Sequence, residues 1–278
     1  MLILIVFGIV LVYIEVIIFT EVIIMEIKGS VAISTGAASG MGFLFSKEWA
    51  RLGGKVCLCD IDKDTLAARV AEINALYPDS AIGSVCDVRH YNEVISSCDK
   101  ALSAFGKIDC LCNFAGGTAV RMQGVDREKH PEFPDVPISV YDWGIDVNLK
   151  GPFYFSHAVS SVMRKQKHGL IINIGSITGM EGDGYGMDYP TSKAGLMFGF
   201  TKSLAQFGAP HGIRAVCISP GPVLTREAMA TMRTLVGRAA DPQEIVDLIM
   251  FIASDKGEFI NGENIMIDGG RNAMARDR

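Results

Sequence analysis

The sequence VAISTGAASGMG, residues 31–42, decides the fold of this chain. It begins with a short apolar run and passes through a turn that contains Gly36, Gly40 and Gly42, and a helical stretch then continues to about Leu52. A strand, a glycine-rich turn and a helix in this order let the backbone approach a pyrophosphate at the helix amino terminus. Three glycines would also suit a purely structural turn, so the rest of the chain must decide between the two readings.

Seven apolar runs of this kind read as strands and alternate with helical segments along the chain. The strand runs are residues 31–34, 55–59, 81–86, 108–112, 170–174, 214–218 and 264–267. The main helical stretches after the first are residues 63–76, 94–105 and 141–165, one that begins near Tyr189, and one that Asp241 caps and Pro242 opens. This alternation predicts an α/β protein with a parallel sheet of about seven strands and helices on both faces. No linker or repeat interrupts it, so we expect one domain over residues 25–278.

The composition excludes some classes of function. The 278 residues carry a net charge of −5 without a block of like charges in the body of the chain, which argues against a nucleic-acid surface. The cysteines have no C-x-x-C spacing and no zinc-type grouping with histidine. We therefore expect no metal site, and we expect the cysteines to be small buried hydrophobic residues in a protein of a reducing compartment. The seven are Cys57, Cys59, Cys86, Cys98, Cys110, Cys112 and Cys217.

Residues 1–24 differ from the rest of the chain because they are almost wholly apolar. Their length would span a bilayer, but Glu15 within the run costs about 3 kcal/mol there. No basic residue precedes the run, as one would in a signal peptide. Three readings stay open: a membrane anchor, a packing segment, and an extension outside the functional protein, whose body would then begin at Met25.

A carboxylate follows the second strand at the distance that a dinucleotide site requires. Asp60 comes about twenty residues after the glycine turn, where it suits the ribose hydroxyls of NAD and repels the extra phosphate of NADP. Ile61 follows it, and the glycine turn contains no Arg or Lys. The sequence therefore predicts NAD, unless Asp60 instead caps the helix that begins near Lys63, a task that Asp62 or Asp64 could also perform.

Candidate catalytic residues gather in GSITGMEGDGYGMDYPTSK, residues 175–193. Tyr189 and Lys193 are four positions apart, so on a helix they share one face. An ammonium group beside a phenol favours the phenolate, which can then exchange a proton with a substrate near neutral pH. Ser176 could supply a hydrogen bond to the same substrate oxygen. A solvent-facing helix start remains the alternative reading of the pair, and Asn148 adds a mid-helix amide of poor helix propensity that hints at a further function.

Two segments could border a substrate. Residues 118–139 are polar, broken by prolines, and long for a loop inside a compact domain, which indicates one wall of a substrate site or surface decoration. Residues 226–238 are short and Met-rich, so they read as a small lid or as a plain connecting helix. The loop within residues 175–193 would complete the enclosure.

From about Ile27 to Gly270 the chain resembles the compact, single-domain branch of the short-chain dehydrogenase/reductases. The resemblance rests on TGAASGMG, Asp60, the CDV turn, NFAG, Asn148, Ser176, YPTSK and the PGPVLT turn, in the family's order and spacing. It implies a Rossmann-type, doubly wound sheet that binds a nicotinamide cofactor. Two departures stand out: Phe114 replaces a frequent Asn, which leaves the tying of two strands to Asn113, and the segment after Thr225 is shorter than in many members.

The same resemblance implies a role for each matching residue. Tyr189 would be the acid/base, Ser176 would orient the substrate oxygen, Lys193 would bind the ribose and favour the phenolate, and Asn148 would hold a water that leads to Lys193. The implied cofactor contacts are Gly36, Ser39, Gly40, Met41, Gly42, Asp60, Asp87, Val88, Asn113, Ala115, Gly116, Tyr189, Lys193, Pro220, Gly221, Val223 and Thr225.

The resulting hypothesis is an NAD-dependent oxidoreductase that interconverts a secondary alcohol and a ketone. A bulky, mostly apolar alcohol such as a hydroxysteroid is a plausible substrate, and sugars, polyols and small hydroxy acids stay open. A 3-oxoacyl thioester reductase is the alternative within the class, although such enzymes usually use NADPH and Asp60 argues against that. A non-catalytic nicotinamide-binding protein is the alternative from another class. We expect a cytoplasmic homo-oligomer, a tetramer by family analogy, with membrane association only if residues 1–24 serve as an anchor.

Overall fold

The structure is a computed structural model that describes residues 27–119 and 132–274. The apolar segment 1–24 lies outside these residues, as does most of the predicted substrate loop 118–139. Among the helices that are described, none is both long enough and apolar enough to cross a membrane.

Seven parallel strands form one sheet in the order β3-β2-β1-β4-β5-β6-β7. The strands are β1 (Val31–Thr35), β2 (Lys55–Asp60), β3 (Ala81–Val85), β4 (Cys110–Asn113), β5 (Gly169–Ile174), β6 (Ile213–Pro220) and β7 (Asn264–Ile267). All six strand pairings are parallel, and the central strands are buried on both faces, as their continuous apolar runs require. The Rossmann-like α/β fold that the sequence predicts is confirmed.

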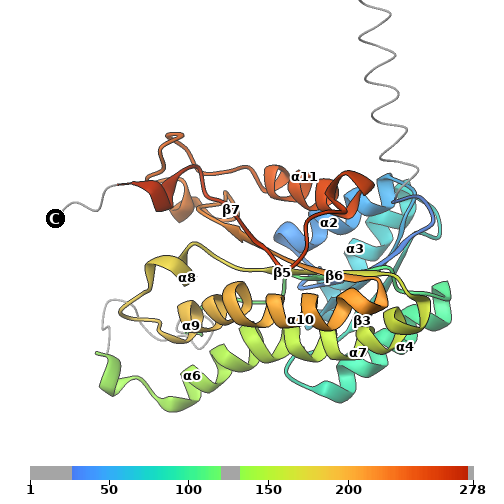
Figure 1. Cartoon of the computed structure of the whole chain (residues 1–278), viewed down its shortest axis with the longest axis horizontal. Helices are drawn as coiled ribbons and strands as arrows, with labels where there is room; N and C mark the ends of the chain where they lie inside the picture. Colours follow the sequence, from blue (N-terminus) through green and yellow to red (C-terminus); the bar gives the residue numbers. More distant parts are fainter. Residues whose placement is uncertain (1–26, 120–131, 275–278) are drawn as a thin grey trace, which may run out of the picture.

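Helices cover both faces of this sheet (Figure 1). One layer contains α2 (Gly40–Arg51), α3 (Lys63–Leu76) and α11 (Pro242–Ala253). The opposite layer contains α4 (Tyr91–Phe105), α6 (Ile138–Ile145), α7 (Gly151–Gln166), α9 (Asp188–Ala194) and α10 (Thr201–Gly208). The one-turn helix α8 (Thr178–Glu181) lies at the end of the sheet between β5 and α9.

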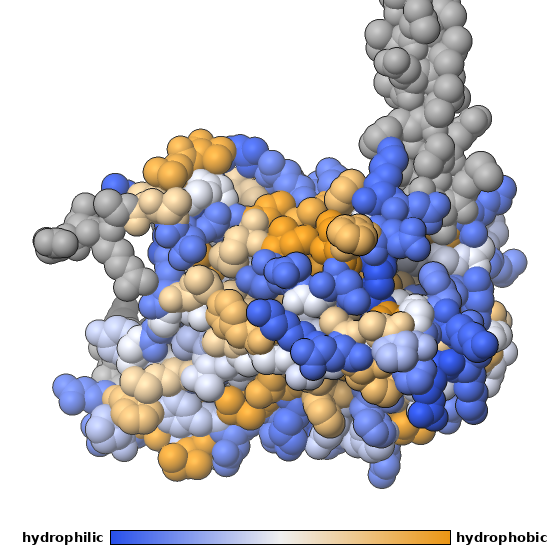
Figure 2. Space-filling view, in the orientation of Figure 1, coloured by the Kyte–Doolittle hydropathy of each residue, from blue (hydrophilic) through white to orange (hydrophobic). Residues whose placement is uncertain are grey.

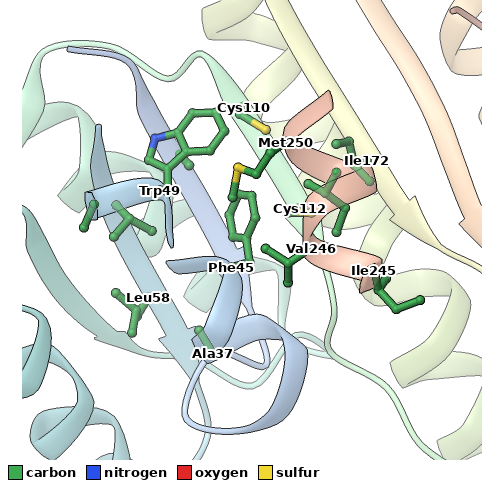
Figure 3. Packing of buried hydrophobic residues seen from close by; sticks show 14 of the residues in the cluster. Ala37, Phe45, Trp49, Leu58, Cys110, Cys112, Ile172, Ile245, Val246 and Met250 are labelled. Carbon is green, nitrogen blue, oxygen red and sulfur yellow. The ribbon is translucent and has the colours of Figure 1, made fainter. Parts of the chain in front are cut away.

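The core on the α2 side is built from aromatic and aliphatic side chains of helices distant in sequence. Phe45 and Trp49 of α2 have ring centroids 5.3 Å apart and are almost wholly buried. Figure 3 shows them beside Val246 and Met250 of α11, with Cys110 of the sheet near Trp49. Packing of this kind, worth about 1.5–3 kcal/mol for each fully buried large side chain, fixes α2 and hence the glycine turn that precedes it.

Two local predictions are corrected by the structure. The helix expected at residues 141–165 begins three residues earlier, after Pro137, and contains a π-helical turn, Asp146–Lys150, between α6 and α7. Residues 226–238 are not a continuous helix, because only Glu227–Met229 forms a 3₁₀ turn. A π-helical turn inserts one residue into the helical ladder and often marks a functional position, here the position of Asn148.

All seven cysteines are buried and unpaired, as the sequence predicts. Burial raises the pKa of the Cys98 and Cys110 thiols to about 12 and that of Cys86 to about 11. These thiols therefore behave as small apolar groups of the core. Among the residues that the structure describes, no group of three or more His, Cys, Asp and Glu side chains is arranged to hold a metal ion.

Candidate active site

The candidate site lies at the carboxyl edge of the sheet, where strand order reverses between β1 and β4. Open α/β sheets bind ligands at such a switch point, because the loops that leave neighbouring strands diverge to opposite faces. A cleft of about 560 Å³ opens there. Its lining residues are Gly36, Ser39, Gly40, Met41, Gly42, Asp60, Ile61, Cys86, Asp87, Val88, Arg89, Phe114, Ala115, Gly116, Trp143, Val147 and Thr225.

The glycines of the first turn have a steric reason to be glycine. Gly36 has φ +64°, and a Cβ there would lie 2.9 Å from the Cα of Ala115. A Cβ on Gly42 would lie 2.6 Å from the carbonyl oxygen of Gly36. Backbone cannot give way as a side chain can, so both positions exclude any other residue. A Cβ on Gly40 would meet nothing within 4 Å, which leaves open space at the start of α2.

Asp60 is oriented toward this turn by the backbone. Its Oδ2 accepts a hydrogen bond from the Ala38 amide at 2.9 Å, and its Oδ1 accepts one from the Asp62 amide at 3.0 Å. The helix α3 is instead capped by Asp62, whose side chain accepts from the Thr65 amide at 3.1 Å. The capping alternative for Asp60 is therefore wrong, and its carboxylate faces the cleft.

Asp87 has a partner that the sequence did not reveal. Both of its carboxylate oxygens accept hydrogen bonds from Arg89, with the Nε of Arg89 at 2.9 and 3.0 Å. This guanidinium holds the pKa of the Asp87 carboxyl below its usual range. The Arg89 guanidinium also lies 6.0 Å from the ring of Trp143 across the cleft. Any adenine group here would therefore meet an ion pair rather than a free carboxylate.

Asn113 and Ala115 secure the end of β4. The Asn113 amide donates to the Asn173 side chain of β5 at 3.0 Å, and Asn173 donates onward to the hydroxyl of Thr201 at 3.1 Å. The Ala115 amide donates to the hydroxyl of Thr35 in β1 at 3.0 Å. Asn113 therefore ties two strands together, as the sequence predicts, but it does so in the interior and does not line the cleft.

Asn148 is wholly buried and bridges the loop after β4 to α6. Its Oδ1 accepts from the Gly117 amide at 2.9 Å, and its Nδ2 donates to the carbonyls of Gly117 and Gly144 at 2.8 and 2.9 Å. A Cβ on Gly116 would lie 2.6 Å from this Oδ1 and 3.5 Å from Nζ of Lys193. The cleft and the Tyr189–Lys193 group are therefore adjacent, with glycine as the only residue that fits between them.

Lys193 is almost wholly buried and lies beneath Tyr189. Tyr189 comes one helical turn earlier in α9. The Nζ of Lys193 donates to the carbonyl of Ile174 at the end of β5, at 2.6 Å, and lies 5.5 Å from the centroid of the Tyr189 ring. Burial of a lysine ammonium group costs free energy unless the charge is paired or hydrogen-bonded. The pair is thus not a solvent-facing helix start, which was the alternative reading of the sequence.

Ser176 follows β5 and leads into α8. Its hydroxyl accepts a hydrogen bond from the Thr178 amide at 3.1 Å and lies 3.2 Å from the Thr178 hydroxyl. The residue is buried, with 8% of its surface exposed, so that its hydroxyl has a defined orientation. This places Ser176 at the same edge of the sheet as α9, which α8 contacts.

Sequence reasoning missed Asp188, the residue just before Tyr189. It is 3% exposed, and neither of its carboxyl oxygens has a hydrogen-bond partner among the described residues. Burial raises the pKa of this carboxyl, while the nearby backbone amides of Asp188, Tyr189 and Ala119 act in the opposite direction. The carboxyl lies against Gly144, where a Cβ would stand 1.8 Å from its Oδ2. Only the tertiary contact of α6 with α9 reveals this.

The turn after β6 packs against the end of β7. The Gly221 amide donates to the Ile267 carbonyl of β7 at 2.9 Å, and a Cβ on Gly221 would lie 2.6 Å from the Cα of Asp268. Val223 is buried, whereas Thr225 reaches the cleft. Of the residues predicted to contact the cofactor, Asn113, Tyr189, Lys193, Pro220, Gly221 and Val223 lie outside the lining of this cleft.

Six lining residues were not predicted from the sequence: Ile61, Cys86, Arg89, Phe114, Trp143 and Val147. Trp143 and Val147 lie four positions apart, so they share one helix face, and this spacing could have indicated them as a pair. The others directly follow or precede predicted residues. Their assembly from separate strand ends and one helix is a consequence of topology that no local pattern records.

The cleft fits an elongated dinucleotide cofactor. The space at Gly40 and the amino terminus of α2 suit a pyrophosphate, and the Asp60 carboxylate at the end of β2 suits a ribose. Gly116 joins the cleft to Lys193. These features suit the pyrophosphate and one ribose of a dinucleotide.

The sequence model of a protein family described as "Enoyl-(Acyl carrier protein) reductase" matches residues 36–272. The match begins at the first glycine of the turn and ends just beyond β7. It therefore covers every candidate residue discussed above.

Curated proteins of several named activities are similar over nearly their whole length. The 3-oxoacyl-[acyl-carrier-protein] reductase FabG of Thermotoga maritima is 34% identical over 260 residues, 88% of this chain and 99% of its own. The 3alpha-hydroxysteroid dehydrogenase of Mediterraneibacter gnavus is 29% identical over 88% of this chain and 98% of its own. Xanthoxin dehydrogenase of Arabidopsis thaliana is 30% identical over 88% and 90% respectively.

Proposed function

The chain belongs to the short-chain dehydrogenase/reductase family of nicotinamide-dependent oxidoreductases, and we propose that it interconverts a secondary alcohol and a ketone with NAD as its cofactor. The observation that carries the proposal is the burial of Lys193 beneath Tyr189, at the edge of a cleft suited to a dinucleotide. When bound, the cofactor accepts or supplies the hydride of the reaction.

Tyr189 is the proposed proton carrier at the substrate oxygen. The Lys193 ammonium, held by the Ile174 carbonyl, lies close enough to stabilise a negative charge that develops on the phenol. In oxidation the phenolate takes the proton of the alcohol, and in reduction the phenol returns it. The Ser176 hydroxyl, which Thr178 orients, would hydrogen-bond the same oxygen.

Asn148 is proposed to act through Lys193. Its side chain is hydrogen-bonded to the backbone of Gly117 and Gly144, so it holds these two backbone segments at a fixed distance from the lysine. The family analogy adds a water between Asn148 and Lys193 that would pass the proton of Tyr189 to solvent. The close approach of both side chains to Gly116 supports such a path.

The preference for NAD is proposed from Asp60. Its carboxylate is held toward the glycine turn by two backbone amides, so it cannot easily turn away from a cofactor. A ribose hydroxyl can donate to this group, whereas a phosphate at the same place would be repelled by it.

A bulky, mostly apolar alcohol is the proposed substrate. Side chains on segments that flank Ser176 and Thr225 expose apolar surface, namely Met180, Tyr185 and Leu224. Two of the similar proteins bear names that refer to a hydroxysteroid and to xanthoxin. A hydroxysteroid-like ring system would pack against this exposed apolar surface.

A 3-oxoacyl thioester reductase is the second candidate, favoured by the similarity to the FabG protein. Its carrier-bound substrate is also a ketone, so Tyr189 and Ser176 would serve it equally well. The choice between NAD and NADP distinguishes these two candidate functions, because Asp60 disfavours a phosphorylated ribose. A nicotinamide-binding protein without catalysis is the third, and it would have no need of the complete Ser176, Tyr189 and Lys193 set.

The test is a panel of secondary alcohols, ketones and 3-oxoacyl thioesters, each with NAD(H) and with NADP(H), followed by nicotinamide absorbance. We expect turnover of apolar alcohols with NAD; a clear preference for NADP(H) would refute the reading of Asp60. Tyr189→Phe should lower kcat by about 10²–10⁴. Cofactor binding, followed by the fluorescence of Trp143 in the cleft, should remain, and substantial residual turnover would exclude the proposed proton transfer.

We further propose that residues 25–278 form a single nicotinamide-binding domain and that the protein is a cytoplasmic homotetramer. Seven free, buried thiols support a reducing compartment, and the tetramer rests on family analogy. Measurement of the molecular mass in solution tests the proposed tetramer. A variant that starts at Met25 tests the role of residues 1–24, because loss of turnover would show that the apolar segment is required.

A further inference from the structure

An ion pair joins two segments that lie 90 residues apart in the chain. Arg271 follows β7, and its Nε lies 2.9 Å from Oε1 of Glu181 in α8. The Nη2 of Arg271 donates to the Oε2 of the same carboxylate at 3.1 Å. The two side chains are only 23% and 27% exposed. A bidentate pair partly shielded from water is stronger than an ordinary surface pair.

Arg271 also holds the segment that follows β6. Its Nη1 donates to the carbonyl oxygen of Arg233 at 3.2 Å. Beside it the Val236 amide donates to the Gly269 carbonyl at 3.0 Å, and a Cβ on Gly270 would lie 2.9 Å from the Leu235 side chain. The turn after β7 therefore supports residues 233–236 of this segment.

The helix α8 connects this support to the catalytic groups. On its inner side, a Cβ at Gly179 would lie 2.9 Å from the amide nitrogen of Ala194, so α8 packs directly on α9. Thr178 orients the Ser176 hydroxyl. On its outer side, Glu181 binds Arg271. Because α8 is a single turn, its position depends on these contacts rather than on its own hydrogen bonds.

The two supported segments expose apolar side chains. Figure 2 shows hydrophobic groups on the loop that Figure 1 draws between β6 and α11. In this loop Leu235 and Val236 are 64% and 62% exposed, and Met180 of α8 is 41% exposed. Arg271 therefore links the two segments that carry these exposed apolar side chains.

We propose that Arg271 and Glu181 are positioning residues. They hold α8 and residues 226–238 in place as one wall of the substrate site, and they thereby determine the affinity for the alcohol or ketone. The inference rests on the proposed function. The pair keeps α8 and residues 226–238 at a fixed separation, so an apolar substrate meets a preformed surface and does not have to order two loops on binding. Neither residue lines the cofactor cleft.

Steady-state kinetics with the best alcohol of the panel test this. Glu181→Gln removes the charge at constant size and should raise KM for the alcohol about fivefold, which corresponds to about 1 kcal/mol. Arg271→Met should raise it further, because it also loses the bond to the Arg233 carbonyl. In both variants KM for NAD should stay within about twofold of the wild type. The swap Glu181→Arg with Arg271→Glu restores the pair and should lower KM again.

A matched control is the pair of Arg51 with Glu48 in α2, which is also bidentate, at 2.8 and 2.6 Å. Glu48→Gln should leave every kinetic constant unchanged. The proposal is overturned if KM for the alcohol is unaffected in Arg271→Met while its thermal stability falls, since the pair would then be purely structural. Equal increases in both Michaelis constants would overturn it as well.

Amide hydrogen exchange provides a readout that needs no substrate. Arg271→Met should speed exchange in both Thr178–Glu181 and residues 226–238, whereas Glu181→Gln should speed it mainly in the first. Unchanged exchange in both segments refutes the positioning role. If the wild type turns over no alcohol or ketone, the proposed function fails, and the exchange data still decide whether the pair fixes the two segments.

Discussion

Gly144→Ala is the substitution for which the structure makes the sharpest prediction. Alanine is ordinarily favoured over glycine inside a helix by about 1 kcal/mol. At this position, however, the added Cβ would lie 1.8 Å from Oδ2, 2.5 Å from Cγ and 2.7 Å from Cβ of Asp188, where ordinary contact begins at 3.4 Å. The whole carboxyl group would have to move, or α6 and α9 would have to separate.

Overpacking of a well-packed interior costs about 1–3 kcal/mol, and three short contacts favour the upper end. After the gain in helix propensity, about 2 kcal/mol of destabilisation remains. The melting temperature should therefore fall by about 4–8 °C. Because Tyr189 follows Asp188 directly and Asn148 donates to the Gly144 carbonyl, kcat should fall as well.

The assay is urea denaturation of Gly144→Ala, Asp188→Ala and the double variant. Removal of the carboxyl makes room for the methyl group, so the double variant should be more stable than the two single effects predict, by a coupling of about 2 kcal/mol. Gly199→Ala is the control, because its Cβ would meet nothing within 4 Å and helix propensity alone should act. An unchanged stability of Gly144→Ala, or simple additivity in the double variant, would refute the steric argument.

Three more measurements follow from individual groups. Burial raises the pKa of Asp188 above its ordinary value of 3.8, with a smaller contribution from Asp183, so the folded state binds this proton more readily than the unfolded state. The contribution of Asp188 to stability should then fall as the pH rises above that value, so Asp188→Asn should gain relative to the wild type over the same rise in urea titrations; a constant difference would contradict this. Asp60→Ala should weaken NAD binding about tenfold and reduce the discrimination against NADP, as measured by fluorescence titration; unchanged NAD affinity would exclude the ribose contact. Burial raises the pKa of Cys98 and Cys110 to about 12, so a thiol reagent should react with no thiol quickly in the native protein and with seven after unfolding; one fast native thiol would show an opening of the core.

Much of the fold was predictable because its signals are local. Strand runs such as those of β2 and β5 are recognised by their β-branched and apolar residues, and the glycine turn by three residues within seven positions. The helix that Asp241 caps was also predictable, and the structure shows the full capping box with Glu244. The π-helical turn at Asn148 and the irregular course of residues 226–238 were not, since both depend on what the segment packs against.

The candidate site likewise has one part that the sequence predicts and another that only the tertiary structure shows. From sequence alone, Tyr189 and Lys193 share a helix face, Ser176 follows a strand, and Asp60 follows the glycines at the required distance. Only the tertiary structure decided that Lys193 is buried, that Arg89 engages Asp87, that Asp188 lies against Gly144, and that Arg271 reaches Glu181. Spacing along one helix or strand determines which side chains can share a face, whereas contacts between elements depend on how the whole sheet and its helical layers close, and no short stretch of sequence carries that information.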